Sequence, residues 1–163
     1  MEEQVFVVTG GGRGIGRAVT AQLVAPGRRV VALVRGAPPA PVPGVEYVRG
    51  DLGDVASTRQ AAAALAAACP RIDVLIHNAG VLPSRRELTA DGVEQAFQTN
   101  HLAPFLLTHL LAERIARVVQ VSAGLYVKGE ADPLVTATGE RFHPIRTYAD
   151  TKLCNLLLLP LWA

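Results

Sequence analysis

The feature that most constrains the fold of this chain is a short apolar run followed at once by a glycine-rich turn. Residues 5–8 are continuously apolar, as in a strand that is buried on both faces of a parallel sheet. The turn over residues 10–16, GGGRGIG, leads into a helical pattern that ends at Pro26-Gly27. Because glycines let backbone N–H groups at a helix N-terminus approach a phosphate, this order indicates a nucleotide phosphate site. The literal G-x-G-x-x-G spacing is absent, so a purely structural turn is the alternative.

The rest of the chain alternates apolar runs with helical periodicity, which is typical of βαβ units. The pattern predicts an α/β fold, a doubly wound parallel sheet of about five strands. The predicted strands are residues 5–8, 30–34, 45–48, 72–76 and 118–121, and the predicted helices are residues 14–25, 55–68, 91–112 and one that starts near Tyr148. The stretch of residues 124–147 is predicted to be irregular.

The composition is that of a globular protein. Half of the 163 residues are hydrophobic and 18% are charged, which excludes a disordered or fibrous chain and fits one domain over residues 1–163. The fourteen arginines are scattered and the four histidines do not cluster with cysteines or carboxylates, so neither a nucleic-acid surface nor a metal site is predicted. We expect a cytoplasmic protein, because the chain has only two cysteines and no room for a signal peptide before residue 4. We expect no membrane span, because the apolar tail is only eleven residues long.

Residues 35–44, RGAPPAPVPG, break the alternation. Four prolines in ten residues exclude a crossover helix and predict an extended, polyproline-like connection. Arg35 directly follows the second predicted strand, and Arg13 lies in the glycine turn. No acidic residue occurs between residues 30 and 44 to bind the ribose 2′-hydroxyl of NAD, whereas arginine accommodates the 2′-phosphate of NADP. The two arginines together favour NADP(H), the alternative being that both are solvated surface side chains.

Tyr148 and Lys152 lie four residues apart in the last predicted helix. Positions i and i+4 share one helix face, so the phenol and the ammonium can point into one cleft. A free phenol titrates near pH 10, and a nearby cation lowers its pKa toward the range useful for proton transfer. The pair is a candidate general acid/base with its electrostatic partner; the alternative is a half-buried tyrosine beside a lysine that extends to solvent.

Asn100 precedes Pro104 by four residues within the predicted helix 91–112. Because proline has no N–H, the Asn100 carbonyl loses its usual i+4 donor. A kink there would leave this carbonyl free to bind an ordered water, which we predict. The alternative is that Pro104 only bends the helix around the core.

Five motifs occur in the order seen in the short-chain dehydrogenases/reductases. They are Thr9 to Gly16, Asp51-Leu52, Asn78-Ala79-Gly80, Asn100, and Tyr148 to Lys152. Residues 100–111 and 147–153 look like the retinol-dehydrogenase-like branch of that family. The resemblance covers essentially the whole chain. It implies a Rossmann-like sheet and an NAD(P)-dependent enzyme that interconverts a small-molecule carbonyl and an alcohol by hydride transfer.

The resemblance also implies roles for individual residues. The cofactor would be held by Gly10, Gly14, Ile15 and Gly16 at the pyrophosphate, by Asp51 and Leu52 at the adenine, and by Asn78, Ala79 and Gly80 at the floor of the site. Tyr148 would be the general acid/base and Lys152 its partner, both also in contact with the cofactor, and Asn100 would hold a proton-relay water.

The serine position departs from the family pattern. An ungapped match after the fifth predicted strand places Ser122 one position early and Ala123 at the catalytic serine. Successive strand residues point to opposite faces, so this offset would turn the hydroxyl away. Either a local bulge or gap lets Ser122 act, or the hydrogen bond to the substrate carbonyl is missing.

Two further expectations follow from the resemblance. Family members continue into a sixth and a seventh strand, so the C-terminal substrate-binding segment would be missing here. Two leucine-rich helix faces would form a homodimer: Leu106, Leu107, Leu110 and Leu111, and Leu153, Leu156, Leu157 and Leu159. The competing prediction is a truncated, non-catalytic nucleotide-binding or dimerising module.

Overall fold

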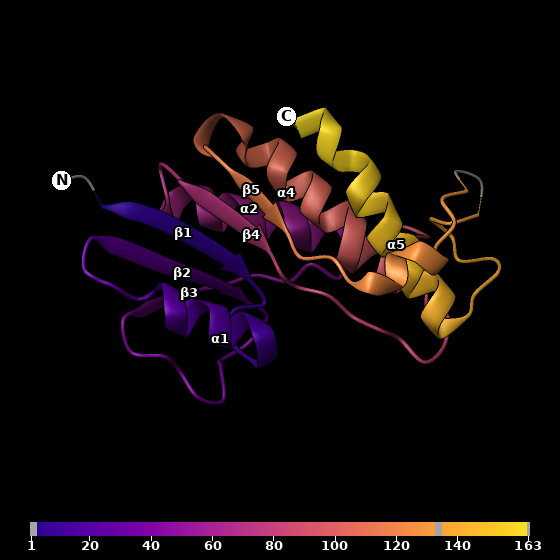
Figure 1. Cartoon of the computed structure of the whole chain (residues 1–163), viewed down its shortest axis with the longest axis horizontal. Helices are drawn as coiled ribbons and strands as arrows, with labels where there is room; N and C mark the ends of the chain where they lie inside the picture. The colour runs from indigo at the N-terminus through magenta and orange to yellow at the C-terminus, as the bar shows by residue number, and fades with distance from the viewer. Residues whose placement is uncertain (1–2, 133–134, 163) are drawn as a thin grey trace. The chain divides into compact units, whose positions relative to one another are not determined.

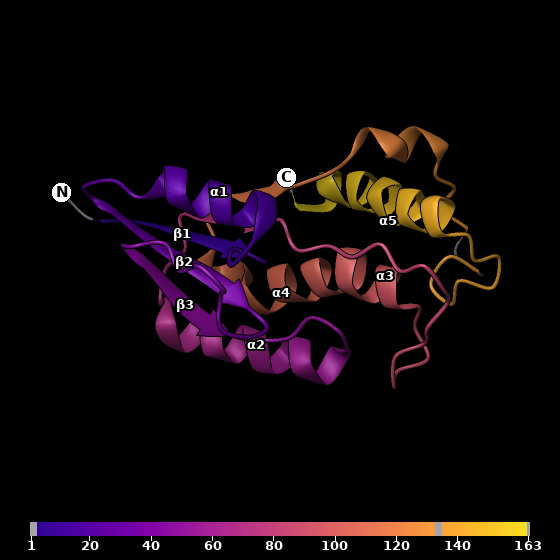
Figure 2. The ribbon, with the colours of Figure 1, turned by 90° about the horizontal axis from the view of Figure 1, so that it is seen from below.

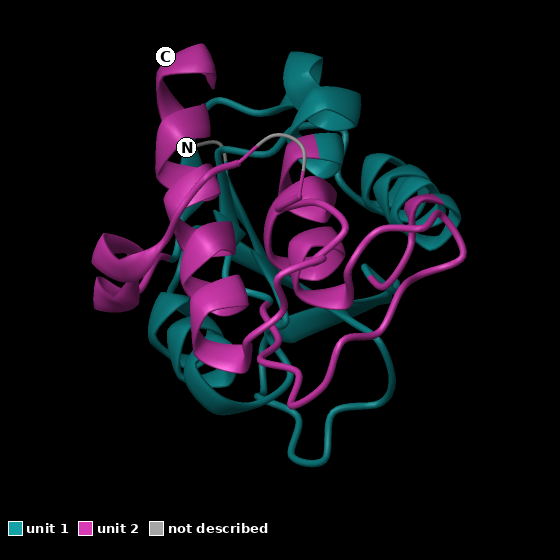
Figure 3. Ribbon diagram, turned by 90° about the vertical axis from the view of Figure 1, so that its right-hand side faces the viewer, with its two compact units in different colours: residues 1–52, 56–79, 106–121 teal, residues 53–55, 80–105, 122–163 magenta. Residues whose placement is uncertain are grey.

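A computed structural model of the chain describes residues 3–132 and 135–162 and divides into two compact units (Figure 3). Unit 1 consists of Met1–Leu52, Ala56–Ala79 and Leu106–Val121, and unit 2 consists of Gly53–Val55, Gly80–Phe105 and Ser122–Ala163. The polypeptide passes from one unit to the other several times. A single domain over residues 1–163 stays a prediction.

Unit 1 is built around a five-stranded parallel sheet (Figure 1). Its strands are β1 (Gln4–Thr9), β2 (Arg28–Val34), β3 (Val45–Arg49), β4 (Val74–His77) and β5 (Val118–Gln120), and they lie in the order β3-β2-β1-β4-β5. Every neighbouring pair is parallel. The strand order reverses between β1 and β4, which is the switch point where ligands bind at the carboxyl ends of the strands. The prediction of a Rossmann-like α/β fold with a parallel sheet of about five strands is therefore confirmed.

Helices cover both faces of this sheet. α1 (Gly14–Leu23) lies on one face and α2 (Val55–Ala68) on the other (Figure 2). The strands β1 and β2 pair from Gln4 with Arg28 to Thr9 with Leu33, and the apolar side chains of residues 7–8 and 30–34 are buried. The alanine-rich α2 buries Ala61, Ala62 and Leu65, because small side chains allow the helix to pack closely on the sheet.

The proline-rich connection between β2 and β3 contains no helix, as predicted. The chain bends at Arg35-Gly36 and again at Pro39-Ala40, so it is not one continuous polyproline rod. It is fastened to the rest of unit 1 by two hydrogen bonds: Arg17 Nε donates to the Ala40 carbonyl at 2.8 Å, and the Val42 N–H donates to the Tyr47 hydroxyl at 2.8 Å.

Unit 2 is mainly helical. It contains α3 (Gln95–Phe97), the π-helical turn η1 (Gln98–Leu102), the beginning of α4 (Ala103–Leu111), the 3₁₀ turn η3 (Gly124–Lys128), α5 (Pro144–Leu158) and the 3₁₀ turn η4 (Leu159–Trp162). A further 3₁₀ turn in unit 1, η2 (Ala112–Arg114), follows α4. Within unit 2, α5 packs against η1, α3 and η3.

Several predicted boundaries differ from the structure. The helix expected over residues 91–112 is interrupted by the π-helical turn ahead of Pro104, because proline cannot donate the usual hydrogen bond. α5 begins at Pro144 and not near Tyr148, since proline is well suited to the first turn of a helix. β4 starts two residues late, at Val74, and Ile72 forms only an isolated bridge with Ile115.

None of the helices in residues 3–132 and 135–162 is long and apolar enough to cross a membrane.

Candidate functional site

The glycine turn of unit 1 follows β1 at the switch point. Gly10 adopts a φ of 67°, a conformation that L side chains rarely adopt, and its N–H donates to the Leu33 carbonyl at 2.9 Å. At Gly16 an added Cβ would collide with the Gly10 carbonyl oxygen and with the amide nitrogen of Asn78. The first turn of α1 therefore lies directly against the glycine turn, and no side chain fits between them.

Thr9 joins the carboxyl ends of β1 and β4. Its buried hydroxyl accepts hydrogen bonds from the N–H groups of Asn78 at 3.1 Å and Ala79 at 3.0 Å. The Asn78 side chain donates in return to the Thr9 carbonyl at 3.0 Å. Sequence reasoning gave Thr9 no role, although its place as the last residue of β1 is a usable signal. This side-chain lock fixes Asn78 and Ala79 next to the glycine turn.

The N-terminus of α1 is suited to an anion. Arg13 precedes the helix in an extended conformation, no side chain caps the first N–H groups, and the first turn contains no acidic residue. Ile15 is 71% exposed, so the beginning of the helix is open to solvent. Uncapped N–H groups and the positive end of the helix dipole together favour a phosphate. These residues fit the pyrophosphate of a dinucleotide.

The two arginines predicted to select NADP are both available. Arg13 and Arg35 are exposed, and within the part of the chain that the structure describes neither forms an ion pair or a side-chain hydrogen bond. In the segment after β3, Asp51 is exposed and Leu52 is buried. The predicted cofactor residues of unit 1 thus combine uncapped N–H groups at the start of α1 with two exposed arginines.

Unit 2 contains the Tyr–Lys pair. Tyr148 and Lys152 lie one turn apart on α5, and the Lys152 ammonium is 5.4 Å from the centre of the Tyr148 ring. Lys152 is only 4% exposed, which is unusual for a lysine. Burial lowers the pKa of Lys152 and raises the pKa of Tyr148. In the protein alone, desolvation of the phenolate thus raises the phenol pKa, in contrast to the lowering that the Tyr–Lys spacing predicts.

Asn100 is fully buried and connects three parts of unit 2. Its side-chain oxygen accepts from the Val81 N–H at 2.7 Å, and its side-chain nitrogen donates to the Val81 carbonyl at 2.9 Å and to the Thr151 hydroxyl at 3.2 Å. Its carbonyl, predicted to be free for a water, accepts a hydrogen bond from the Asn155 side chain at 2.8 Å. No pattern in the sequence relates Asn155 to Asn100, so sequence reasoning missed this residue.

Gly80 lies beside both of the preceding groups. A Cβ at this position would be 3.4 Å from the Asn100 side-chain oxygen and 3.8 Å from the Lys152 ammonium. Asn100 and Lys152 are therefore brought together in unit 2, as the resemblance implies.

Ser122 follows β5, and the surroundings of its hydroxyl group are unusual. The pairing of β4 with β5 runs from Leu75 with Val118 to His77 with Gln120 without an inserted residue, so no bulge occurs within the paired strand. The hydroxyl oxygen of Ser122 is nevertheless buried and has no hydrogen-bond partner among the described residues. An unpaired buried hydroxyl is costly and can serve an incoming carbonyl. Ala123, the next residue, caps the 3₁₀ turn η3.

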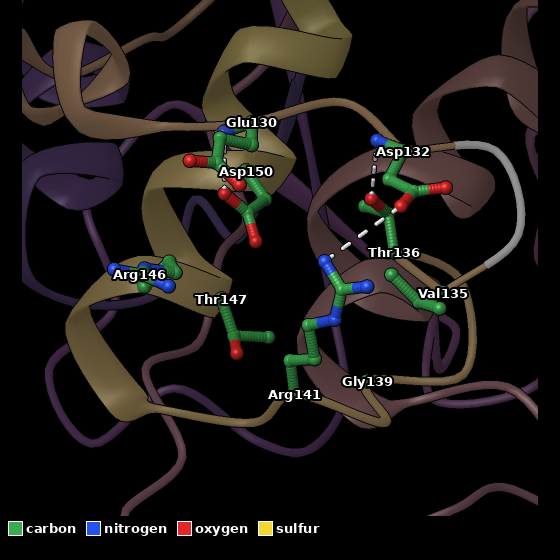
Figure 4. Close-up of a pocket in the computed structure, with 9 residues that line it drawn as sticks. All are labelled: Glu130, Asp132, Val135, Thr136, Gly139, Arg141, Arg146, Thr147 and Asp150. Atoms are coloured by element: carbon green, nitrogen blue, oxygen red, sulfur yellow. Dashed lines mark hydrogen bonds and ion pairs between the residues drawn. The ribbon is translucent and has the colours of Figure 1, made fainter.

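A small cavity of about 30 Å³ lies elsewhere in unit 2 (Figure 4). Its charged lining residues are Glu130, Asp132, Arg141, Arg146 and Asp150. The Glu130 N–H donates to the Asp150 carboxylate at 2.7 Å, and Arg141 is 4.0 Å from Asp132. The cavity has room for about one water, and its lining residues interact with one another. It is therefore interpreted as a part of the packing and not as a binding site. It contains none of the predicted site residues.

Comparison with known proteins shows the family of the chain. The family model described as short chain dehydrogenase matches residues 4–131. The chain belongs to the short-chain dehydrogenase family. In this family member, both cysteines, Cys69 and Cys154, are free, and the described residues contain no group of three or more His, Cys, Asp and Glu that could hold a metal ion.

The relatives agree with a retinol-dehydrogenase-like branch. The chain is 34% identical to human "Dehydrogenase/reductase SDR family member 13" over 93% of its own length and 44% of the relative, and 33% identical to mouse "Retinol dehydrogenase 14" over 96% and 55%. A crystal structure of a "putative uncharacterized protein from Mycobacterium Paratuberculosis" matches with a TM-score of 0.87 at 33% identity, covering 98% of this chain and 61% of that one. The chain spans about half the length of these curated relatives.

Proposed function

We propose that this short-chain dehydrogenase is an NADP(H)-dependent oxidoreductase that interconverts a carbonyl and an alcohol, with Tyr148 as general acid/base. The observation that carries the proposal is the Lys152 ammonium, 4% exposed and 5.4 Å from the Tyr148 ring. Burying a lysine costs free energy, and a solvated position would avoid that cost. Its place beside the phenol supports a functional role.

The cofactor would be held by residues of the glycine turn and its surroundings. The N–H groups at the start of α1 would bind the pyrophosphate, Asp51 and Leu52 the adenine, and Arg13 and Arg35 the 2′-phosphate. When bound, the nicotinamide supplies or accepts the hydride.

The chain's own residues would handle the proton and the oxygen. In the reduction direction the Tyr148 hydroxyl would give its proton to the substrate oxygen, and in oxidation the phenolate would take it back. A protonated Lys152 would stabilise that phenolate. The unpaired Ser122 hydroxyl would donate a hydrogen bond to the substrate oxygen, and Asn100 would hold the Lys152 side of the site in place.

The test is NADPH consumption by the purified chain with a panel of aldehydes and ketones. Tyr148→Phe is the matched control, because it removes only the hydroxyl. We expect it to lower kcat by about 10²–10⁴-fold while NADPH binding is kept. Carbonyl-dependent turnover that is equal in the two proteins would overturn the assignment of Tyr148.

Cofactor preference has a separate test. Arg13→Ala and Arg35→Ala should each weaken NADPH binding by about 10- to 100-fold, the effect of losing one charge-assisted hydrogen bond, and should leave NADH binding nearly unchanged. Equal losses for the two nucleotides would show that the arginines do not select the 2′-phosphate.

A non-catalytic nucleotide-binding or dimerising module is the second candidate. Ala123 favours it, because it stands where the family pattern places the catalytic serine. This candidate predicts NADPH binding without turnover on any carbonyl.

A homodimer through α4 and α5 is proposed for either candidate function. Leu110, Leu157 and Leu159 are between 36% and 59% exposed, whereas Leu106, Leu107 and Leu111 are buried. Light scattering of the purified chain tests that state. The cytoplasmic location stays a prediction.

A further inference from the structure

The π-helical turn of unit 2 exposes a backbone carbonyl to α5. Pro104 has no N–H to donate to Asn100, and in this turn the Ala103 N–H reaches back five residues to the Gln98 carbonyl. The Asn100 carbonyl is buried and lacks its usual i+4 donor, so a donor from another element stabilises it. Asn155 supplies one from α5, with its side-chain nitrogen 2.8 Å from the carbonyl oxygen.

The direction of the hydrogen bond from Asn155 to Asn100 determines the direction of the hydrogen bond between Asn155 and His101. Because the Asn155 amide nitrogen must face the Asn100 carbonyl, its side-chain oxygen faces His101, whose Nδ1 is 2.9 Å away. An amide oxygen only accepts, so His101 Nδ1 must carry the proton. Asn155 is itself 2% exposed. The three residues therefore form a short hydrogen-bonded chain with a single possible polarity, from the half-buried imidazole to the buried amide and carbonyl.

The same turn is tied to α5 a second time. The Asn100 side chain donates to the Thr151 hydroxyl, which donates to the Tyr148 carbonyl at 2.7 Å. Lys152 is the next residue on α5, and its ammonium and the Asn100 side-chain oxygen lie within 4 Å of one point in front of Gly80. The hydrogen bonds that hold Asn100 against α5 thus also determine how closely the Asn100 side chain and the Lys152 ammonium pack in front of Gly80.

We propose that Asn155 is a positioning residue whose amide locks the Asn100 turn onto α5 and so keeps Lys152 and the Asn100 amide packed around Gly80, away from bulk water. The inference rests on the proposed role of Lys152. It places a side chain on the carbonyl where the family resemblance implies a proton-relay water. One lone pair of that carbonyl is thereby committed to the protein itself.

The chain offers a direct readout, since Lys128 and Lys152 are its only lysines. In protein labelled with ¹³C-lysine, the Cε resonances can be followed against pH without cofactor or turnover. The Lys128→Arg background leaves Lys152 alone. In this background Lys152 should titrate below the ordinary lysine value, because burial lowers its pKa.

Asn155→Leu keeps the size of the side chain and removes both of its hydrogen bonds. We expect water to reach Lys152 and its pKa to rise by about half a unit or more toward the ordinary value. The ¹⁵N shifts of His101 should also lose the signature of an Nδ1-protonated ring. Leu111→Ala, a core change in unit 1, is the matched control: it should lower stability and leave both signals in place.

The proposal is overturned if Lys152 titrates identically in folded Asn155→Leu and in the parent, or if it already titrates at the ordinary value in the parent. If Asn155→Leu does not fold, His101→Phe and Asn155→Asp, which each remove one hydrogen bond of the chain, are measured in its place under the same criteria. Absence of NADPH turnover would overturn the proposed function and leave this result intact, because the titration needs no reaction.

Discussion

A buried histidine should make unit 1 sensitive to mild acid. His77 ends β4 and is 1% exposed, and its Nε2 lies 2.8 Å from the hydroxyl of Thr108. Burial lowers the pKa of His77 from 6.5 to about 3. The folded protein therefore keeps this ring neutral in a pH range where the unfolded chain binds a proton.

The sign and the size follow from proton linkage. Stability is fully present above pH 6.5, where His77 is neutral in both states, and it is lost as the pH falls from 6.5 toward about 3. At about 1.4 kcal/mol per pH unit, the loss from this one group reaches on the order of 2 kcal/mol at pH 5 and 5 kcal/mol at pH 3. His101, whose pKa burial also lowers, adds a loss of the same sign.

The assay is urea unfolding followed by far-UV circular dichroism at pH 7.5, 6.5, 5.5 and 5, with hydrogen exchange at the Val8 and Leu75 amides reporting on unit 1 alone. His77→Gln keeps a side chain that can hydrogen-bond to Thr108 and removes the titration. We expect the parent to lose about 2 kcal/mol more than this variant between pH 6.5 and 5. The matched control His109→Gln, at an exposed site, should retain the parent's slope. Parallel pH dependence in parent and His77→Gln would refute the reasoning.

Three further substitutions test the site and the sheet. Thr9→Val should lower the free energy of unfolding by about 2–5 kcal/mol, because it strands two backbone N–H groups, whereas Thr9→Ser should cost less than half of that; chemical unfolding measures both. Gly16→Ala should abolish NADPH binding in a fluorescence titration, whereas Gly36→Ala, where a Cβ meets open space, should bind as the parent does. Glu46→Gln should cost less than about 1 kcal/mol in the same unfolding assay, since its pair with Arg29 is largely solvated; a larger loss would contradict that.

The sequence was a reliable guide wherever the signal was local. The strand predicted over residues 30–34 lies within β2, and the glycine turn over residues 10–16 follows β1 as predicted, because a buried parallel strand and a tight glycine turn each depend on a few consecutive residues. A disturbance of the helix ahead of Pro104 was predicted, and the structure has a π-helical turn there, because a missing N–H is a property of that residue alone. These features needed no knowledge of distant contacts.

Features set by distant residues were missed. Asn155 is 55 residues from the carbonyl that it binds, so no spacing in the sequence relates the two. The start of α5 at Pro144 was missed for a different reason: helical periodicity is weak in that stretch, although a proline suited to the first helical turn is a local signal. The rise in the Tyr148 pKa comes from burial, which the Tyr–Lys spacing does not reveal.

The side chain of Asn100 pairs with Val81 as the edge of a neighbouring strand would, accepting from its N–H and donating to its carbonyl. Only a carboxamide imitates a peptide group in this way. Aspartate would set a second acceptor against the Val81 oxygen, leucine would offer nothing, and glutamine would hold the same group one methylene too far out. A library randomised at position 100 and selected for folding should therefore return asparagine almost alone.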